Sequence, residues 1–423
     1  MKLASSTSLN MAAMAGGAQR RALRALLNHS GAPRSYSTAP TPSAPPPPPA
    51  TSASDPTSAQ PARKKRVVFS GIQPTGVPHI GNHLGALAQW QRLVKEVAAQ
   101  PEESRDELYF SVVGMHALTV PQDPVRLRQE RRDMFAVLLA LGLTDPKTGA
   151  AVFHQDQVLE HGELAWYLNT VTPVNRLMRM TTWKSKLVTL RNAKSEDEID
   201  DSMLQLGLLA YPVLQAADIL LYKTTHVPVG HDQSQHLELC RDIAQVFNRA
   251  YPGRRRDGKG KGKGPFRMPE VMLTTHPRIQ SLRNPLQKMS KSAPSEASKI
   301  YLTDSPEAIH SKIKTAVTDS IQGVTWDPEN RPGIATLLQI YEGYSGEPVE
   351  DIAKRYTGQR GIMEMKADLA ECVSEGLRGF REEFARIRTE EAYLREKERE
   401  GADKARATAS RTMEDVRAAI GLD

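Results

Sequence analysis

The feature that most constrains the fold is a short apolar segment that leads directly into a glycine-bearing turn and then into a helical pattern. Val67–Ser70 has the composition of a buried strand, Gly71–Gly76 interrupts it, and a helix is predicted from about Gly81 to Val97. A strand followed at once by a helix is the building unit of parallel sheets with crossover helices. Such sheets bind ligands at the carboxyl ends of their strands. The sequence therefore predicts a ligand site at this turn.

Strand and helix patterns continue to alternate along the chain. Further strands are predicted at Leu108–Val113, Ala151–Phe153 and Val227–Val229, and helices at 124–142, 158–190, 212–222 and 234–250. From about residue 305 onward nearly every pattern is helical. We therefore expect an α/β protein with a Rossmann-like, doubly wound parallel sheet and a C-terminal α-helical domain.

The first sixty residues differ from the rest of the chain. They contain five basic residues and one acid, and residues 40–62 are rich in Pro, Ser, Thr and Ala. This composition is typical of an organellar transit peptide followed by an unstructured linker. Arg34–Ser37 has the character of a matrix-processing site, which favours the mitochondrial matrix. A tail without a targeting role is the alternative.

We expect three parts along the chain. Residues 1–62 form the transit peptide and linker. Residues 63–295 form the Rossmann-like domain, with a helical insertion at about 155–225 and a flexible basic loop at 253–265. Residues 296–423 form the helical domain. The net charge of +7 is concentrated in the first part and in the basic loop, so any attraction for nucleic acid is local. The loop either contacts RNA phosphates or has no role.

Composition excludes several classes of protein. Cys240 and Cys372 are too few for a disulfide framework or a cysteine-rich zinc site. The longest apolar stretch, 204–222, is interrupted by polar residues and is a poor candidate for a membrane span. Three histidines could suggest a metal site, but their five-residue spacing does not place them on one helical face: His226, His231 and His236.

The groups around the first turn suit a phosphate. Gly71 and Gly76 permit a close approach of the backbone to a ligand. A helix that begins near Gly81 offers free N–H groups and the positive end of its dipole. His79 and Asn82 flank this helix start and could donate hydrogen bonds to the same ligand. Alternatively, the role of these residues could be limited to forming the turn and capping the helix.

Two further segments carry polar side chains that suit the same ligand. Lys288–Ser292 supplies two lysines and two serines, and positioned ammonium groups stabilise the charge that develops on a triphosphate. Taken alone, it could be an ordinary surface loop. Gly230–Gln233 follows a strand and opens a helix, where glycine allows close approach and the amide of Gln233 can bind a polar group. It could equally be a loop with a helix cap.

A polar stripe interrupts the apolar helix predicted at 212–222. Pro212 suits the first position of a helix. If the helix begins there, steps of four and three residues place Tyr211, Gln215 and Asp218 on one stripe. A buried, unpaired carboxylate is costly, so Asp218 must meet a hydrogen-bond donor. That donor is either a structural group of the protein or an N–H group of a ligand.

Together these segments resemble tryptophanyl-tRNA synthetases of the bacterial and mitochondrial type, over roughly residues 66–422. The resemblance is carried by segments 69–76, 79–82, 116–120, 211–222, 227–233, 288–292 and 316–320. It implies a class I aminoacyl-tRNA synthetase that activates tryptophan with ATP and Mg²⁺ and transfers it to tRNA(Trp). In this family the tryptophan carboxylate attacks the α-phosphate of ATP. The family is dimeric, which implies an interface near residues 155–185, and its C-terminal helices recognise the anticodon.

The resemblance also implies roles for individual residues. Asp218 would accept a hydrogen bond from the indole N–H, and Tyr211 and Gln233 would bind the substrate ammonium. The implied tryptophan-binding residues are Phe69, Gly71, Gln73, His116, Tyr211, Asp218, Val229 and Gln233. The implied ATP-binding residues are Gln73, Pro74, Thr75, Gly81, Asn82, Gly230, His231, Asp232, Ile279, Lys288, Met289, Ser290, Lys291 and Ser292. The implied catalytic residues are His79, Asn82, Lys288, Ser290 and Lys291. Mg²⁺ would be bound through the ATP phosphates, without metal ligands from the protein.

Some residues depart from the common bacterial pattern. His231 stands in place of the usual acid, Gln215 stands where methionine is common, and Ala293 stands where aspartate is frequent. Three other classes of protein compete with this interpretation. They are a tyrosyl-tRNA synthetase, a nucleotidyltransferase of the same superfamily and a non-enzymatic RNA-binding descendant. The residues around Asp218 argue against a tyrosyl-tRNA synthetase. The long helical C-terminal region argues against a nucleotidyltransferase. The presence of both lysines, Lys288 and Lys291, argues against a non-enzymatic descendant.

Overall fold

The computed structural model describes residues 64–180, 182–191, 204–230, 234–253, 260–273, 278–357 and 361–423. Within it, Ala62–Asp423 form one compact unit. The predictions for the transit peptide and for the centre of the basic loop, 254–259, lie outside the described residues. No helix in the described ranges is long and apolar enough to cross a membrane.

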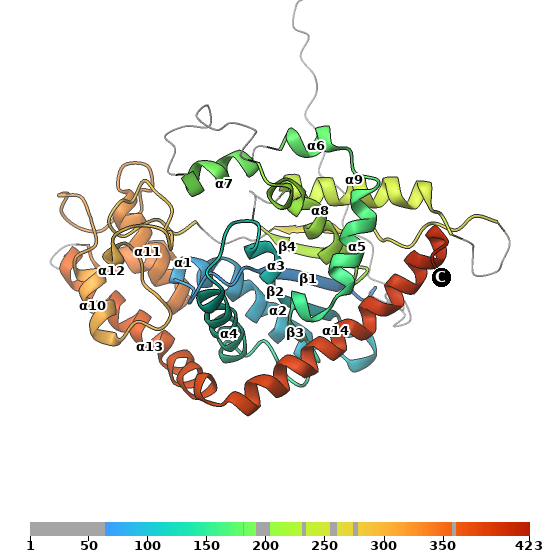
Figure 1. Ribbon diagram of the computed structural model, residues 1–423. Coiled ribbons are helices and arrows are strands. Elements are labelled where there is room, and N and C mark those ends of the chain that lie inside the picture. The colour runs from blue at the N-terminus through green and yellow to red at the C-terminus, as the bar shows by residue number, and fades with distance from the viewer. Residues whose placement is uncertain are drawn as a thin grey trace, which may run out of the picture. The chain divides into compact units, whose positions relative to one another are not determined.

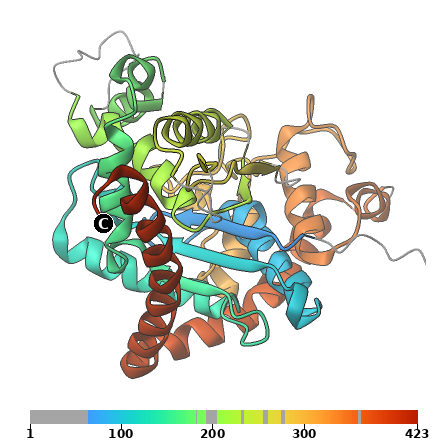
Figure 2. The same cartoon turned by 90° about the vertical axis from the view of Figure 1, so that its right-hand side faces the viewer.

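A parallel sheet of five strands occupies the centre of this unit, in the order β3-β2-β1-β4-β5 (Figure 1, Figure 2). The strands are β1 Val67–Ile72, β2 Glu107–Val112, β3 Ala151–His154, β4 His226–Val229 and β5 Glu270–Leu273. All four neighbouring pairs are parallel. The chain moves outward from β1 to β3 and then returns to place β4 on the other side of β1. This reversal confirms the predicted doubly wound sheet and creates a switch point between β1 and β4.

Alternate strand residues face two separate apolar layers. Val68, Phe110 and Val152 pack into one core with α2 (Ala88–Ala98) and α4 (Pro124–Ala140). Their neighbours Phe69 and Tyr109 pack into the other core with α8 (Leu206–Leu220) and α9 (Ser234–Ala250). Burial on both faces explains why these strands are continuous apolar runs rather than alternating ones.

The helices before β5 follow the predicted ranges with some interruptions. They are α1 Ile80–Asn82, α2 Ala88–Ala98, α3 Gly114–Ala117, α4 Pro124–Ala140, α5 Glu160–Asn169, α6 Val174–Met178, α7 Thr182–Arg191, α8 Leu206–Leu220 and α9 Ser234–Ala250. A π-helical turn, His83–Leu87, joins α1 to α2, so the predicted helix at 81–97 is continuous but bulged. The predicted helix at 158–190 is divided into α5, α6 and α7.

The predicted start of α8 is wrong. The helix begins at Leu206, so Pro212 lies inside it and not at its first position. Proline there removes one backbone hydrogen bond, but α8 is largely buried and packs against α5 and α9, and this packing outweighs the loss. The spacing of Tyr211, Gln215 and Asp218 is unaffected.

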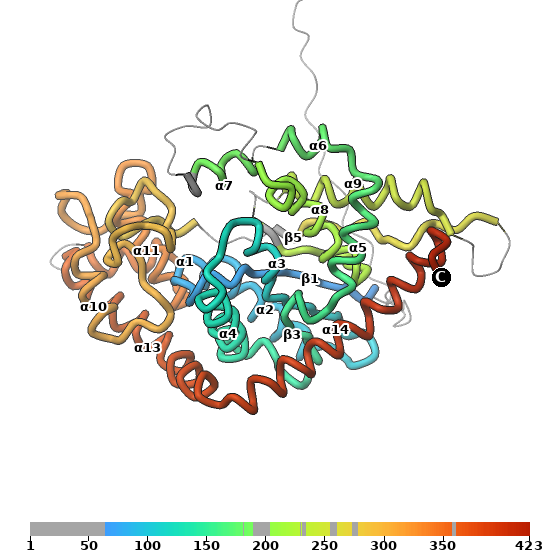
Figure 3. Tube along the Cα trace, viewed as in Figure 1, coloured from blue at the N-terminus to red at the C-terminus, as the bar shows by residue number. Residues whose placement is uncertain are grey.

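The C-terminal region is helical, as predicted. Its helices are α10 Pro306–Lys314, α11 Pro332–Ser345, α12 Val349–Arg355, α13 Ile362–Thr389 and α14 Glu391–Ile420. α13 packs on α4, and α14 continues beneath β3 towards α5 (Figure 3). A Cβ atom at Gly401 would lie 1.8 Å from the carbonyl oxygen of Val152, so only glycine allows α14 to approach β3 this closely. The last helix is therefore part of the layer that covers the sheet.

Candidate active site

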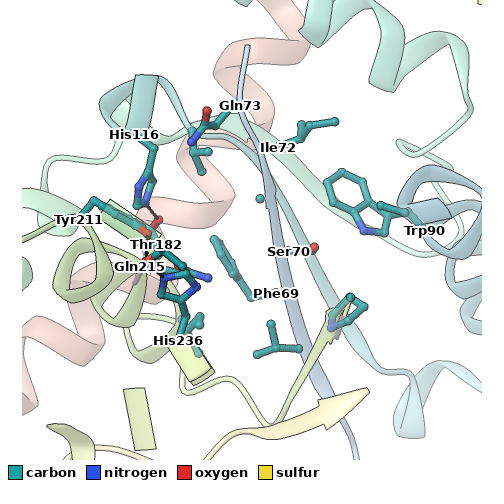
Figure 4. A pocket seen from close by; sticks show the side chains of 18 of the residues that line it. Phe69, Ser70, Ile72, Gln73, Trp90, His116, Thr182, Tyr211, Gln215 and His236 are labelled. Atoms are coloured by element: carbon teal, nitrogen blue, oxygen red, sulfur yellow. Dashed lines mark hydrogen bonds and ion pairs between the residues drawn. The ribbon is translucent and has the colours of Figure 1, made fainter. Parts of the chain in front are cut away.

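A cavity of about 550 Å³ lies at the switch point between β1 and β4. Figure 4 shows Phe69 pointing from β1 towards His116, Tyr211 and His236, with Ser70 and Trp90 on the opposite side of the strand. A pocket at this position is the usual ligand site of a doubly wound sheet.

The structure brings together residues that are far apart in the sequence. The following predicted site residues line the cavity: Phe69, Gly71, Gln73, His116, Tyr211, Asp218 and Gly230. Gln215 lines it too, so the whole predicted stripe of α8 faces the cavity. Val229 ends β4, but its side chain lies outside the described residues, as do His231, Asp232 and Gln233.

Asp218 is 2% exposed, and both of its carboxylate oxygens are hydrogen-bonded within the protein. His116 Nε2 donates to Oδ2 at 2.9 Å, and His161 Nδ1 donates to Oδ1 at 2.7 Å. The amide of Gln155 donates to both oxygens, at 2.7 and 2.9 Å. Three donor nitrogens thus make these four contacts, and the Gln155 amide nitrogen bridges the two oxygens. The donors that the sequence required are thus two histidines and a glutamine.

These donors keep the carboxylate ionised. Burial alone raises the pKa of Asp218, but the hydrogen bonds and positive charge of His116 and His161 outweigh burial and lower the pKa to about 2. Asp218 is therefore an anion at any physiological pH, and its charge faces an otherwise largely apolar cavity.

Sequence reasoning did not identify Gln155 or His161. Gln155 follows β3 directly, so its position at a carboxyl strand end was the available signal. His161 lies in α5, and no local pattern distinguishes it. Its Nε2 and the Tyr222 hydroxyl form a hydrogen bond of 2.7 Å, and the Tyr222 ring stacks on Phe69 at 5.4 Å. His161 and Tyr222 thus link the Asp218 carboxylate to Phe69, which lines the cavity.

Tyr211 is fixed by two other helices. Its hydroxyl donates to Thr182 in α7 at 2.7 Å and lies 3.0 Å from His236 Nε2 in α9. The Lys186 ammonium lies 3.6 Å from the centre of the Tyr211 ring, a cation–π contact. Burial raises the pKa of Tyr211, so the hydroxyl stays protonated and polar at the cavity wall.

The residues after the turn Gly71–Gly76 cap the helix start, the alternative role that the sequence allows for them. His79 Nδ1 accepts a hydrogen bond from the Asn82 backbone N–H, and the Asn82 side chain accepts one from the His79 N–H. The Ile80 N–H donates to the Ile300 carbonyl at 2.8 Å, so two of the predicted free N–H groups have partners inside the protein. Burial, with the charges of nearby lysines, lowers the pKa of His79 to about 4 and keeps its ring neutral.

The lysine loop, Lys288–Ser292, lies directly against the first turn. Lys291 Nζ donates to the carbonyl oxygens of Thr75 and Gly76, at 3.2 and 2.7 Å, and to the Thr75 hydroxyl at 3.1 Å. Met289 is buried, and its N–H donates to the Ile279 carbonyl at 3.1 Å. Burial lowers the pKa of Lys291 to about 8. Two segments predicted to bind one triphosphate are thus in contact.

Comparison with known proteins defines the class. A family model described as class I tRNA synthetases (W and Y) matches residues 61–378. The mitochondrial tryptophan–tRNA ligase of Schizosaccharomyces pombe is 41% identical over 360 residues, which cover 84% of this chain and 95% of that protein. The tryptophan–tRNA ligase of Bacillus anthracis is 41% identical over 357 residues, or 84% of this chain and 98% of its own.

Solved structures agree with the sequence comparison. Tryptophanyl-tRNA synthetase from Campylobacter jejuni, complexed with ADP and tryptophan, aligns with a TM-score of 0.66 at 30% identity, covering 84% of this chain and all of that one. The enzyme from Mycoplasma pneumoniae aligns with a TM-score of 0.67 at 30% identity, covering 85% of this chain and 99% of that one.

The doubly wound sheet, the switch-point cavity and the adjoining lysine loop are those of a class I aminoacyl-tRNA synthetase. Within that class the chain belongs to the tryptophan–tRNA ligase family. This confirms the resemblance seen in the sequence.

Proposed function

We propose that the chain activates L-tryptophan with MgATP and transfers it to tRNA(Trp) for mitochondrial translation. The tryptophan carboxylate attacks the α-phosphorus in line, and pyrophosphate leaves. A hydroxyl of the terminal ribose of the tRNA then takes the acyl group, and AMP leaves. The attacking carboxylate is already ionised at neutral pH, so activation needs no protein base. Mg²⁺ accompanies the ATP phosphates, which supply oxygen ligands of the kind it prefers.

The observation that carries this proposal is the ionised carboxylate of Asp218 at the wall of an apolar cavity. An indole ring suits the aromatic and aliphatic lining, and its N–H needs an acceptor. Both oxygens of Asp218 already accept hydrogen bonds inside the protein, and the residue is only 2% exposed, so we infer that the indole N–H replaces one donor. His116 is the donor that lines the cavity, whereas Gln155 and His161 are completely buried behind it. We therefore assign the exchangeable position to His116.

The nucleotide side of the proposal rests on the contact between the first turn and the lysine loop. Lys291 bridges them through its ammonium, and exposed Lys288 lies at the start of the loop. ATP phosphates that enter this contact would replace Thr75 and Gly76 as the partners of the Lys291 ammonium. The charge on departing pyrophosphate is then stabilised by both lysines. His79 positions the helix start and, being neutral, does not serve as a general acid.

Partners and location complete the proposal. Residues 155–185 expose three large apolar side chains, Leu159, Trp166 and Val174, which are 80%, 69% and 62% exposed. Such a surface suits contact with a second copy of the chain. We assign anticodon recognition to the C-terminal helical region, 296–423, and place the enzyme in the mitochondrial matrix. The basic presequence composition and the mitochondrial relatives support this location.

Amino-acid-dependent exchange of pyrophosphate into ATP tests the proposed function. With purified protein, tryptophan is expected to stimulate exchange, and tyrosine at equal concentration is not. Exchange that tyrosine stimulates and tryptophan does not would overturn the specificity. Exchange with neither amino acid would overturn the proposed activation step.

A further inference from the structure

Lys299 is a buried lysine beside the active site that has no role in the assignments above. Its side chain is only 1% exposed. Removing an ammonium group from water costs several kcal/mol unless polar groups of the protein replace the water. A lysine is therefore kept at such a position only when its ammonium has good partners.

The partners of Lys299 belong to the lysine loop and its continuation. Its Nζ donates to the carbonyl oxygen of Lys291 at 3.0 Å and to that of Ala293 at 2.8 Å. A third contact, 3.2 Å, joins it to the side chain of Glu296, which is 69% exposed. The other two acceptors are thus main-chain carbonyls, one of which belongs to the residue that carries the proposed catalytic cation.

The backbone next to Lys299 is paired with residues 78–80, which follow the turn Gly71–Gly76. The Ile80 N–H donates to the Ile300 carbonyl at 2.8 Å, and the Leu302 N–H donates to the Pro78 carbonyl at 3.0 Å. His79 and Tyr301 form an isolated antiparallel bridge between the same segments. Lys299 therefore reaches the lysine loop from the segment that is paired with the helix start at His79.

We propose that Lys299 is a positioning residue for adenylate formation. It holds the second half of the lysine loop, which contains Lys291, at a fixed position relative to the turn Gly71–Gly76. This inference rests on the proposed function, because it concerns the delivery of Lys291 to ATP. The first half of the loop is held separately, through the backbone contact of Met289 with Ile279.

The Lys299 contact matters most when ATP enters. In the structure, Lys291 is also held by its own ammonium, on the oxygens of Thr75 and Gly76. That ammonium must leave these oxygens to contact phosphate. The bonds from Lys299 engage the main-chain carbonyls of Lys291 and Ala293 instead, so they can persist while the Lys291 side chain moves. They define the point from which the Lys291 side chain extends.

The test compares Lys299→Met with a matched control, Lys366→Met. Lys366 also donates to two main-chain carbonyls, those of Ala316 at 2.8 Å and Lys314 at 3.4 Å, but it lies in α13. Methionine keeps an apolar chain of similar length and removes the ammonium in both variants. Lys299→Gln is a second variant, because its amide can still donate to a carbonyl oxygen.

For Lys299→Met we expect kcat of tryptophan-dependent pyrophosphate exchange to fall by about 10- to 100-fold, the size of effect that a small misplacement of a reacting group produces. Tryptophan binding without ATP should stay within about twofold of wild type, because the indole cavity is untouched. Lys299→Gln should recover part of the lost rate. Lys366→Met should keep both kinetic values and change only the melting temperature.

Three results would overturn the positioning role. One is a Lys299→Met enzyme with wild-type kcat. Another is a loss of tryptophan binding equal to the loss of kcat. The third is failure of both Lys299 variants to fold while Lys366→Met folds, which would make Lys299 a structural lysine. Failure of the proposed function is distinguishable, since wild-type protein would then show no tryptophan-dependent exchange at all.

Discussion

The two halves of the active site are built on opposite principles. On the amino-acid side, a buried carboxylate is surrounded by side-chain donors from α3, α5 and the turn after β3, and both of its oxygens accept hydrogen bonds. On the nucleotide side, the partially exposed Lys291 rests on main-chain and hydroxyl oxygens of the first turn. In the proposed function, the first half selects the amino acid. The second half is held in a position from which its cation can move to a phosphate.

This difference follows from what each half must do. Discrimination between amino acids requires a fixed, desolvated group that penalises any ligand unable to pair with it. Stabilisation of departing pyrophosphate requires cations that can move to the phosphates and do not hold the product. Substitutions should therefore separate into those that damage tryptophan selection and those that damage turnover.

Lys291→Met is expected to have the largest effect. Loss of a positioned charge that acts in the transition state typically reduces kcat by about 10²- to 10³-fold. Tryptophan binding measured without ATP should stay unchanged, because Lys291 does not line the indole cavity. Lys291→Arg, which keeps the charge, should retain more activity than Lys291→Met. A Lys291→Met kcat within threefold of wild type would remove this lysine from the chemistry.

Asp218→Asn should affect the other half. A hydrogen bond to a charged group contributes about 1.5–3 kcal/mol, so kcat/KM for tryptophan should fall by about 10- to 100-fold. The KM for ATP should change little. Asp106→Asn is the matched control, since Asp106 is also 2% exposed and bonded to Arg66 and Gln100 at the far end of β2. An equal loss of tryptophan use in both variants would mean that Asp218 acts only through stability.

The pH profile offers a smaller but direct comparison of the halves. Burial lowers the pKa of Lys291 to about 8, so free enzyme loses this cation as the pH rises above that value. We expect kcat/KM for ATP to fall about tenfold per pH unit above pH 8 and the Lys291→Arg profile to remain flat there. Tryptophan binding without ATP should stay constant from pH 5 to 9, because the pKa of Asp218 is about 2. A profile unchanged by Lys291→Arg would assign the decline to another group.

Much of this arrangement could be predicted from the sequence, because it depends on local patterns. The apolar runs that form β1 to β4 end in glycine, proline or polar residues, and the stripe on α8 depends only on helical spacing. β5, Glu270–Leu273, was not predicted: its Val271 is 39% exposed, whereas the equally short strand β3 is buried along its whole length.

The missed parts of the site depend on long-range contacts. Gln155 and His161 reach Asp218 across 63 and 57 residues, and nothing in their own segments signals a shared acceptor. The same is true of Lys299, whose sequence context resembles an ordinary surface turn. Pro212 was misplaced because the preference of proline for helix starts is weaker than the packing of a long buried helix.

The smallest expected effect concerns the exchange of donors on Asp218. If the indole N–H takes the position of His116 Nε2, tryptophan should shift the ring resonances of His116 in a nuclear magnetic resonance spectrum without ATP. His161 should keep its resonances, because its contacts with Asp218 and Tyr222 are completely buried. An analogue in which sulfur replaces the indole nitrogen should fill the cavity, leave His116 on Asp218 and bind about five- to tenfold more weakly, the value of roughly one net hydrogen bond. Equal displacement of His116 by both ligands would show that the ring, and not its N–H, moves the histidine, and the buried carboxylate would then have no part in recognising tryptophan.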